Sequence, residues 1–253
     1  MLETYIRERR RQKDILLMTH IVMGYPDFDT SMEVVEEMVE AGVDLMELQI
    51  PFSEPMADGP VILGANQASL QGGTRVERCF EFAEQAIEKF DIPFLFMTYY
   101  NILFKYGVEA FVERMAKIDI KGAIVPDLPP EEGRDYLVAM EQKGLAPVHI
   151  FSPMTSNQRM DFLASKTRGF VYCVARKGVT GKETRFTNEL GEYLARCRRS
   201  TDLPLAVGFG VKDRKDVEFL KGKADIAVVG SEMIRVVDRQ GVPGVKDFVK
   251  SLV

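Results

Sequence analysis

The stretch VDLMELQI at residues 43–50 is almost continuously apolar, and a segment with helical periodicity follows it after a proline-rich loop. Seven other short apolar runs recur along the chain, each followed by a turn and then by a similar segment. Runs of this kind are typical of strands that are buried on both faces of a parallel sheet. The predicted strands are 15–23, 43–50, 94–99, 122–125, 146–151, 169–175, 205–207 and 224–229.

Amphipathic helices are predicted between these strands. Apolar residues three and four positions apart form a single stripe over 76–90, and the same spacing recurs over 108–118 and 190–197. A glycine just before a strand is expected to end the preceding helix in a left-handed conformation. Such glycines are Gly42, Gly122, Gly144 and Gly169.

Eight strands that alternate with helices in 253 residues predict an α/β fold, the (β/α)₈ TIM barrel. We expect a single barrel domain over residues 1–253, with an extra N-terminal helix over 2–13 that covers the bottom of the barrel. A doubly wound open sheet is the alternative fold, because its strands have the same apolar pattern. A frayed, solvated end is the alternative for the charged segment 2–13.

Composition and charge exclude several classes of protein. The net charge of −5 argues against a nucleic-acid partner, since phosphates require a basic surface. Apolar runs are too short to span a membrane, and no signal peptide is apparent, so no membrane association is expected. Three cysteines without a pairing pattern indicate a reducing compartment. We therefore expect a cytoplasmic protein.

In a barrel of this kind the active site lies at the carboxyl ends of the strands. Glu47 lies late in the second strand, and Asp58 follows in the loop after it; Asn101 and Asp127 follow the third and fourth strands. Alternation leaves open whether Glu47 faces the barrel interior. Glu47 is either an acid/base group in an apolar setting or one half of a structural salt bridge to an outer helix. Asp58 alone would be interpreted as a helix cap.

Glycines after the last two strands predict a phosphate site. Gly208-Phe209-Gly210 closes the seventh strand, and Gly230-Ser231 closes the eighth and opens a helix. Barrels often bind phosphate at this place through backbone N–H groups and a helix N-terminus. Tight turns are the alternative reason for these glycines. No metal-binding cluster is predicted, because the only histidines, His20 and His149, lie far apart in the sequence.

Six segments resemble the tryptophan synthase alpha subunit family, in family order over essentially the whole chain. The proline-rich loop and the Gly-Val-Thr-Gly loop are the segments most specific to that family among barrels. The segments are LMELQIPFSEPMADGP (45–60), MTYYN (97–101), IVPDLPP (124–130), GVTG (178–181), VGFG (207–210) and VGS (229–231).

The resemblance implies a lyase of tryptophan biosynthesis that cleaves indole-3-glycerol phosphate to indole and glyceraldehyde 3-phosphate, a retro-aldol reaction without a cofactor. It implies that Glu47 points inward as the acid/base and that Asp58 holds the indole N–H. It implies a tryptophan synthase beta subunit as partner, in an alpha2beta2 complex. The implied substrate-binding residues are Tyr172, Phe209, Met97 and Ile124 around the indole, Gly181, Gly210, Gly230 and Ser231 at the phosphate, and Thr180 in a loop that closes over Asp58.

Three residues depart from the family pattern. Gln49 stands where the family usually has Gly, His20 where it has an aromatic residue, and Glu54 where it has Asp. Gln49 and His20 are expected to crowd or polarise an indole pocket, so Gln49→Gly and His20→Phe are expected to restore apolar volume. The alternatives are an alpha-like barrel that mainly binds and activates a beta subunit, and a lyase for another aromatic compound that carries a phosphate.

Overall fold

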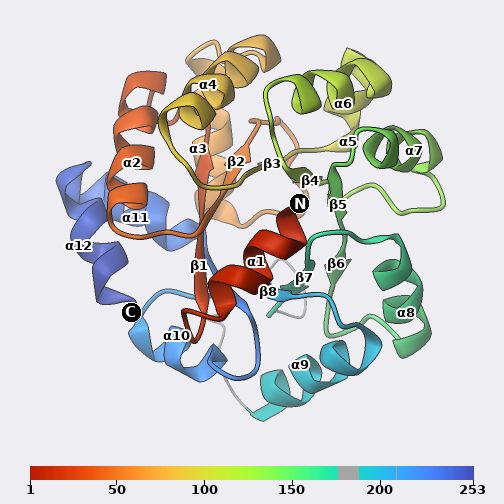
Figure 1. Cartoon of the computed structure of the whole chain (residues 1–253). Coiled ribbons are helices and arrows are strands. Elements are labelled where there is room, and N and C mark those ends of the chain that lie inside the picture. Colours follow the sequence, from red (N-terminus) through yellow and green to blue (C-terminus); the bar gives the residue numbers. More distant parts are fainter. Residues whose placement is uncertain (176–187, 209) are drawn as a thin grey trace.

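The strands of the protein form one parallel sheet that curls into a barrel (Figure 1). The computed structural model describes residues 1–175, 188–208 and 210–253. Around the barrel the hydrogen-bonded order of the described strands is β5-β4-β3-β2-β1-β9-β8-β7-β6, and every pair is parallel. The strands are β1 (Leu16–Val22), β2 (Leu45–Gln49), β3 (Phe94–Met97), β4 (Gly122–Ile124), β5 (Ala146–Val148), β6 (Ile150–Phe151), β7 (Val171–Val174), β8 (Leu205–Gly208) and β9 (Ile226–Val229).

The barrel closes through one strand that is divided in two. The predicted strand 146–151 is present as β5 and β6, which are separated by His149. β5 pairs with β4, whereas β6 pairs with β7, and the N–H of Tyr172 donates to the carbonyl of His149 at 3.0 Å. The short strand therefore links the two ends of the hydrogen-bonded order. The predicted (β/α)₈ barrel is confirmed, and the open doubly wound sheet is excluded.

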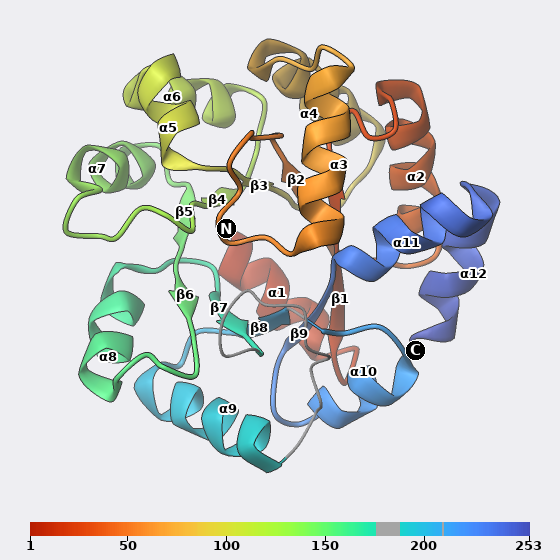
Figure 2. The ribbon, with the colours of Figure 1, turned by 180° about the vertical axis from the view of Figure 1, so that it is seen from behind.

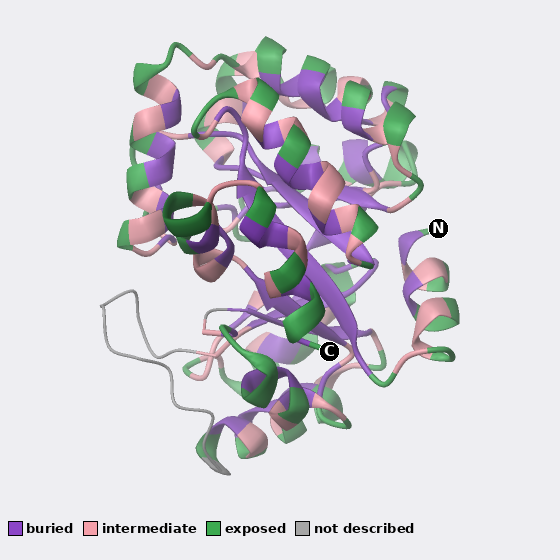
Figure 3. Ribbon diagram, turned by 90° about the vertical axis from the view of Figure 1, so that its left-hand side faces the viewer, coloured by how far each residue is buried: buried purple, intermediate pink, exposed green. Residues whose placement is uncertain are grey.

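Alternation along each strand separates the barrel interior from the layer beneath the helices. One cluster of buried side chains fills the barrel interior, and we call it the interior cluster. Most of the strands contribute one or two residues to it, including Leu45 of β2 and Leu95 of β3. A second, larger cluster takes the alternate strand residues together with the apolar stripes of the helices. The strands are accordingly buried on both faces, while the helices expose their outer sides (Figure 3).

Helices surround the barrel (Figures 1 and 2). The predicted stripes over 76–90, 108–118 and 190–197 are present as α4, α6 and α9. In the part of the chain that is described, no helix is both long and apolar enough to cross a membrane. The helices are α1 (Leu2–Arg10), α2 (Phe28–Glu40), α3 (Pro60–Gln71), α4 (Val76–Lys89), α5 (Tyr100–Tyr106), α6 (Val108–Lys117), α7 (Arg134–Gln142), α8 (Asn157–Lys166), α9 (Asn188–Ser200), α10 (Arg214–Leu220), α11 (Ser231–Gln240) and α12 (Pro243–Ser251).

One predicted helix-ending glycine has a different role. The left-handed position after α6 is occupied by Asp119, with φ 67°, and not by Gly122, which begins β4. A Cβ atom at Gly122 would lie 2.3 Å from the carbonyl oxygen of Ala146. Gly122 therefore allows β4 and β5 to approach each other, and the prediction that it caps a helix is wrong.

The predicted N-terminal helix is present as α1, which lies across one end of the barrel (Figure 1). Leu2 and Ile6 belong to the interior cluster and close that end. Asp44 is fully buried, and its Oδ1 accepts hydrogen bonds from Arg9 and from Lys13. Its other oxygen, Oδ2, accepts from the N–H of Leu17. One carboxylate thus ties the segment around α1 to the start of β1.

Replacing Asp44 with alanine is expected to lower the free energy of unfolding by about 2 kcal/mol, because the buried N–H of Leu17 loses its partner. The two cations are about one third exposed, so water partly replaces their lost contacts. Urea unfolding measures the change. Glu40→Ala removes an exposed ion pair with Lys246 and serves as the control, with no measurable effect expected. An unchanged midpoint for Asp44→Ala would contradict this role.

Candidate active site

The carboxyl ends of the strands lie at the end of the barrel opposite α1, where the loop after β2 leads into α3 (Figure 2). Glu47 and Gln49 share a face of β2 with Leu45, which belongs to the interior cluster. Both side chains therefore point into the barrel. This settles the question that alternation alone left open for Glu47.

Glu47 makes a side-chain hydrogen bond across the β1–β2 pair. His20 is the register partner of Glu47, and its Nδ1 lies 3.0 Å from Glu47 Oε2. The two residues are 3% and 2% exposed, so the contact is shielded from water. An ionised carboxylate only accepts hydrogen bonds, so Nδ1 carries the hydrogen when Glu47 is ionised. The alternative of a salt bridge from Glu47 to an outer helix is wrong, because Glu47 faces inward.

Asp58 is held at the same mouth by Gln49 of β2 and by Tyr99, which follows β3. Its Oδ2 accepts a hydrogen bond from Gln49 Nε2 at 2.7 Å and another from the Tyr99 hydroxyl at 3.1 Å. The Tyr99 oxygen in turn accepts from the N–H of Ala57, one residue before Asp58. These bonds fix the carboxylate over the barrel. Asp58 is therefore more than a helix cap, and the residue at the N-cap of α3 is Gly59.

The two carboxylates and their neighbours interact electrostatically. Burial raises the pKa of Asp58, and the hydrogen bond from Gln49, the charge of His20 and the hydrogen bond from Tyr99 oppose that rise. Burial, and then the charges of Glu47 and Asp58, raise the pKa of Tyr172 well above its ordinary value. Tyr172 therefore remains a neutral phenol beside both carboxylates.

Three of the residues expected to surround an indole lie inside the barrel. Met97, Ile124 and Tyr172 all belong to the interior cluster, and Met97 and Ile124 are register partners on β3 and β4. Gly208 provides space for Tyr172, because a Cβ atom there would lie 2.3 Å from the Tyr172 hydroxyl. Phe209, the remaining predicted wall residue, lies outside the described residues.

Three of the residues expected to bind a phosphate, Gly210, Gly230 and Ser231, lie in the described part of the chain. Gly230 is the N-cap of α11, no side chain caps that helix, and Ser231 is its first residue. Gly230 adjoins His20, since a Cβ atom at Gly230 would lie 3.8 Å from the Cβ of His20. Gly210 has φ 131°, a value that side chains rarely permit. Thr180 and Gly181 lie outside the described residues.

Sequence reasoning missed two residues of the site. The sequence indicates Asn101, which is exposed on α5, and not Tyr99. The buried Asn66 of α3 accepts a hydrogen bond from the N–H of Phe52 and so holds the proline-rich loop. A tyrosine at the end of an apolar run was the available signal for Tyr99. Asp127 is exposed and accepts from a backbone N–H of α5, without a contact to Glu47 or Asp58.

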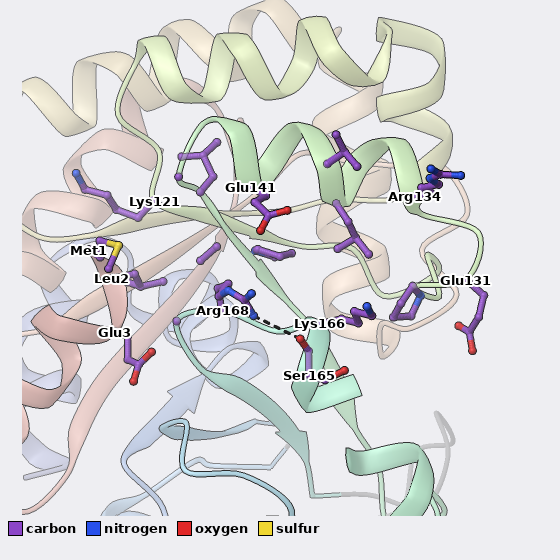
Figure 4. Close-up of a pocket in the computed structure, with 18 residues that line it drawn as sticks. Met1, Leu2, Glu3, Lys121, Glu131, Arg134, Glu141, Ser165, Lys166 and Arg168 are labelled. Carbon is purple, nitrogen blue, oxygen red and sulfur yellow. Dashed lines mark hydrogen bonds between the residues drawn. The ribbon is translucent and has the colours of Figure 1, made fainter. Parts of the chain in front are cut away.

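A separate cavity of about 590 Å³ lies at the end of the barrel covered by α1 (Figure 4). It is lined by Leu2 of α1 and by charged side chains such as Lys121, Arg134 and Arg168. None of these three charged residues is buried. The described residues include no group of three or more His, Cys, Asp or Glu that could hold a metal ion. Glu47 and Asp58, two buried carboxylates whose charges both act on Tyr172, lie instead at the opposite mouth, and we place the site there.

Fold and site together define a (β/α)₈-barrel enzyme with two buried carboxylates at the carboxyl ends of its strands. The family model for the tryptophan synthase alpha chain matches residues 6–250. The chain belongs to the tryptophan synthase alpha chain family, as its sequence motifs suggested, and it is therefore a carbon–carbon lyase.

Known relatives and solved structures agree with this assignment. The tryptophan synthase alpha chain of Desulforapulum autotrophicum is 81% identical over the full length of both chains, and that of Syntrophotalea carbinolica is 68% identical, again over both full lengths. A Mycobacterium tuberculosis tryptophan synthase structure superposes with a TM-score of 0.93 at 31% identity, covering 99% of this chain and 96% of that one. A chain of the Pyrococcus furiosus tryptophan synthase complex gives 0.86 at 27% identity, covering 94% and 97%.

Proposed function

We propose that Glu47 and Asp58 carry out the reaction of this family at the barrel mouth. The chain cleaves indole-3-glycerol phosphate to indole and glyceraldehyde 3-phosphate, a step of tryptophan biosynthesis. The observation that carries the assignment of roles is the pair of buried carboxylates with different partners, one on an apolar strand and one on a loop. Two such environments suit one group for proton transfer and the other for a fixed negative charge.

Glu47 is the acid/base of the proposed mechanism. Cleavage adds a proton to C3 of the indole and removes the proton of the hydroxyl group on the carbon attached to the ring. The electrons of the broken C–C bond return to the ring, and the hydroxyl oxygen becomes the aldehyde oxygen. One proton moves from oxygen to carbon, so a single titrating side chain can transfer it. Glu47 is buried at 2% exposure and has an oxygen without a hydrogen-bond partner among the described residues.

Asp58 accepts the indole N–H and stabilises the positive charge that the ring acquires when C3 is protonated. Tyr172, Met97 and Ile124 surround the ring in this proposal. The phosphate binds at the N-terminus of α11, where backbone N–H groups and the helix dipole attract an anion. Further proposed contacts to the substrate are Gly210, Gly230 and Ser231 in the described part, and Thr180, Gly181 and Phe209 outside it.

The chain works with a tryptophan synthase beta subunit, and we propose an alpha2beta2 assembly. In support, the Pyrococcus furiosus neighbour is described as a tryptophan synthase complex.

We also propose a cytoplasmic location, supported by three buried free cysteines. A single domain over residues 1–253 is supported by the interior cluster, to which α1 and β9 both contribute. The proposed cleavage requires no cofactor, because protons and electron pairs move only between substrate and side chains.

Release of indole from indole-3-glycerol phosphate tests the function. We expect cleavage by the chain alone and a higher rate when the cognate beta subunit is added, because a docked protein can order loops at the mouth. Binding of the two proteins is measured in parallel. A bound beta subunit that leaves the rate unchanged would contradict partner activation. Absence of indole with and without a bound beta subunit would instead favour an alpha-like binding protein.

A further inference from the structure

The two oxygens of Glu47 have different surroundings. Oε2 is 3.0 Å from His20 Nδ1, whereas Oε1 is buried and has no hydrogen-bond partner among the described residues. His20 is itself 3% exposed, and its Nε2 also has no partner there. A buried polar atom without a partner is costly unless a substrate or water completes it. Oε1 is therefore the Glu47 oxygen that is available to a bound molecule.

We infer that His20 is a positioning residue, which holds Oε2 of Glu47 so that Oε1 is the oxygen that exchanges the proton with the substrate. The inference rests on the proposed role of Glu47 as the acid/base. A carboxyl group free to rotate about its last bond can present either oxygen, and a hydrogen bond to one of them removes that freedom.

The hydrogen bond serves both states of the reaction. When Glu47 is ionised, Oε2 accepts from the N–H at Nδ1 of His20. When Oε1 has taken the hydroxyl proton, Oε2 is still an acceptor, so the neutral imidazole keeps the same bond. His20 therefore need not gain or lose a proton during the cycle.

His20 also lies in the electric field of the rest of the site. When protonated, His20 lowers the pKa of Asp58, and Gly230 of the β9–α11 turn, which adjoins His20, carries no charge. Among the described residues, the titratable groups that interact electrostatically with the pair are Asp58, through His20, and Tyr172, through Glu47. Because a hydrogen bond to a carboxylate favours its ionised form, loss of the His20 donor favours the protonated form.

This reasoning reverses the sign of the effect expected from sequence alone for His20→Phe. The aromatic ring adds apolar surface but cannot donate to Oε2. We expect kcat to fall by about 10- to 100-fold, the cost of one hydrogen bond to a charged group. We also expect the acidic limb of the kcat–pH profile to move to higher pH, whereas KM changes less than kcat because the proposed phosphate contacts are backbone N–H groups.

His20→Asn provides the rescue. Its amide nitrogen is at the δ position, where the imidazole has Nδ1, and it donates without titrating. We expect kcat and the acidic limb of His20→Asn to remain close to those of the unchanged protein. The matched control is His149→Asn, since His149 is a buried histidine between β5 and β6 whose Nδ1 contacts Thr167. No change in activity is expected for it.

A double-mutant cycle separates this inference from the proposed function. If His20 acts through Glu47, His20→Phe has no further effect on kcat in a Glu47→Gln background. Equal effects in both backgrounds, or a folded His20→Phe protein with unchanged kcat and pH profile, would overturn the positioning role. If His20→Phe does not fold, His20→Asn decides. A His20→Asn protein that melts at the temperature of the unchanged protein but loses more than about tenfold in kcat would overturn the positioning role. High activity of Glu47→Gln alone would refute the role of Glu47 instead.

Discussion

Replacing Glu47 with glutamine is expected to lower kcat for indole release by about 10²- to 10⁴-fold, the usual contribution of general acid–base catalysis. The amide keeps the volume of the side chain, and its oxygen can accept from His20 Nδ1 in place of Oε2. Only the capacity to take and give a proton is lost. Substrate affinity should change little, because the ring and phosphate contacts remain.

Thermal unfolding and indole release are measured on the same preparation of Glu47→Gln. A loss of activity at an unchanged melting temperature supports the acid/base role. Glu47→Asp keeps a titrating group one methylene further away and is expected to retain more activity than Glu47→Gln. A stably folded Glu47→Gln protein with near-full activity is the result that would remove Glu47 from the mechanism.

Replacing Asp58 with asparagine is expected to lower kcat by about 10²- to 10³-fold, the usual effect of removing one group that stabilises charge in the transition state. The amide oxygen can still accept from Gln49 and Tyr99 where Oδ2 did. The negative charge opposite the indole nitrogen is lost. Asp127→Asn is the matched control, since Asp127 follows the end of β4, accepts a hydrogen bond from the backbone N–H of Tyr100 and acts on Tyr99 only through its charge.

The stability of Asp58→Asn has a defined dependence on pH. Burial raises the pKa of Asp58, so the folded protein binds that proton more tightly than the unfolded chain does. Ionisation therefore destabilises the wild-type protein increasingly as pH rises from the unfolded pKa to the folded one. The variant lacks this cost, so it should be at least as stable as wild type at pH 7 and equal to it in strong acid. A large loss of stability at pH 7 would show that the charge itself holds the loop.

The fold could be predicted from the sequence because burial on both faces leaves a simple apolar pattern. The run at 43–50 and its seven counterparts fall on the observed strands, and the stripe over 76–90 falls on α4. The division of 146–151 at His149 was not predictable, because it depends on which neighbour each half pairs with. Gly122 was misassigned for the same reason, since its steric neighbour Ala146 belongs to another strand.

The candidate site could be predicted only in outline. The positions of the motifs predicted that Glu47 and Asp58 lie at the same barrel mouth. The hydrogen bonds that orient their side chains depend instead on how the strands and loops pair in the folded protein. His20 meets Glu47 because β1 and β2 pair at that position, and a single sequence does not reveal the pairing. Tyr99 reaches Asp58 across 41 residues of chain. Partners at such separations are determined by tertiary packing and leave no local pattern.

The packing of α1 has a consequence for the order in which the chain folds. The partners of this helix are distributed over the whole sequence: Leu2 lies against Gly169, Arg7 donates to the carbonyl of Asp202, and Arg10 pairs with Asp225. During synthesis α1 emerges before any of them. Contacts of such long range must await the closure of long loops. Although α1 is made before these partners, it is therefore among the last helices to dock, and until then the apolar base of the nascent barrel stays open to water.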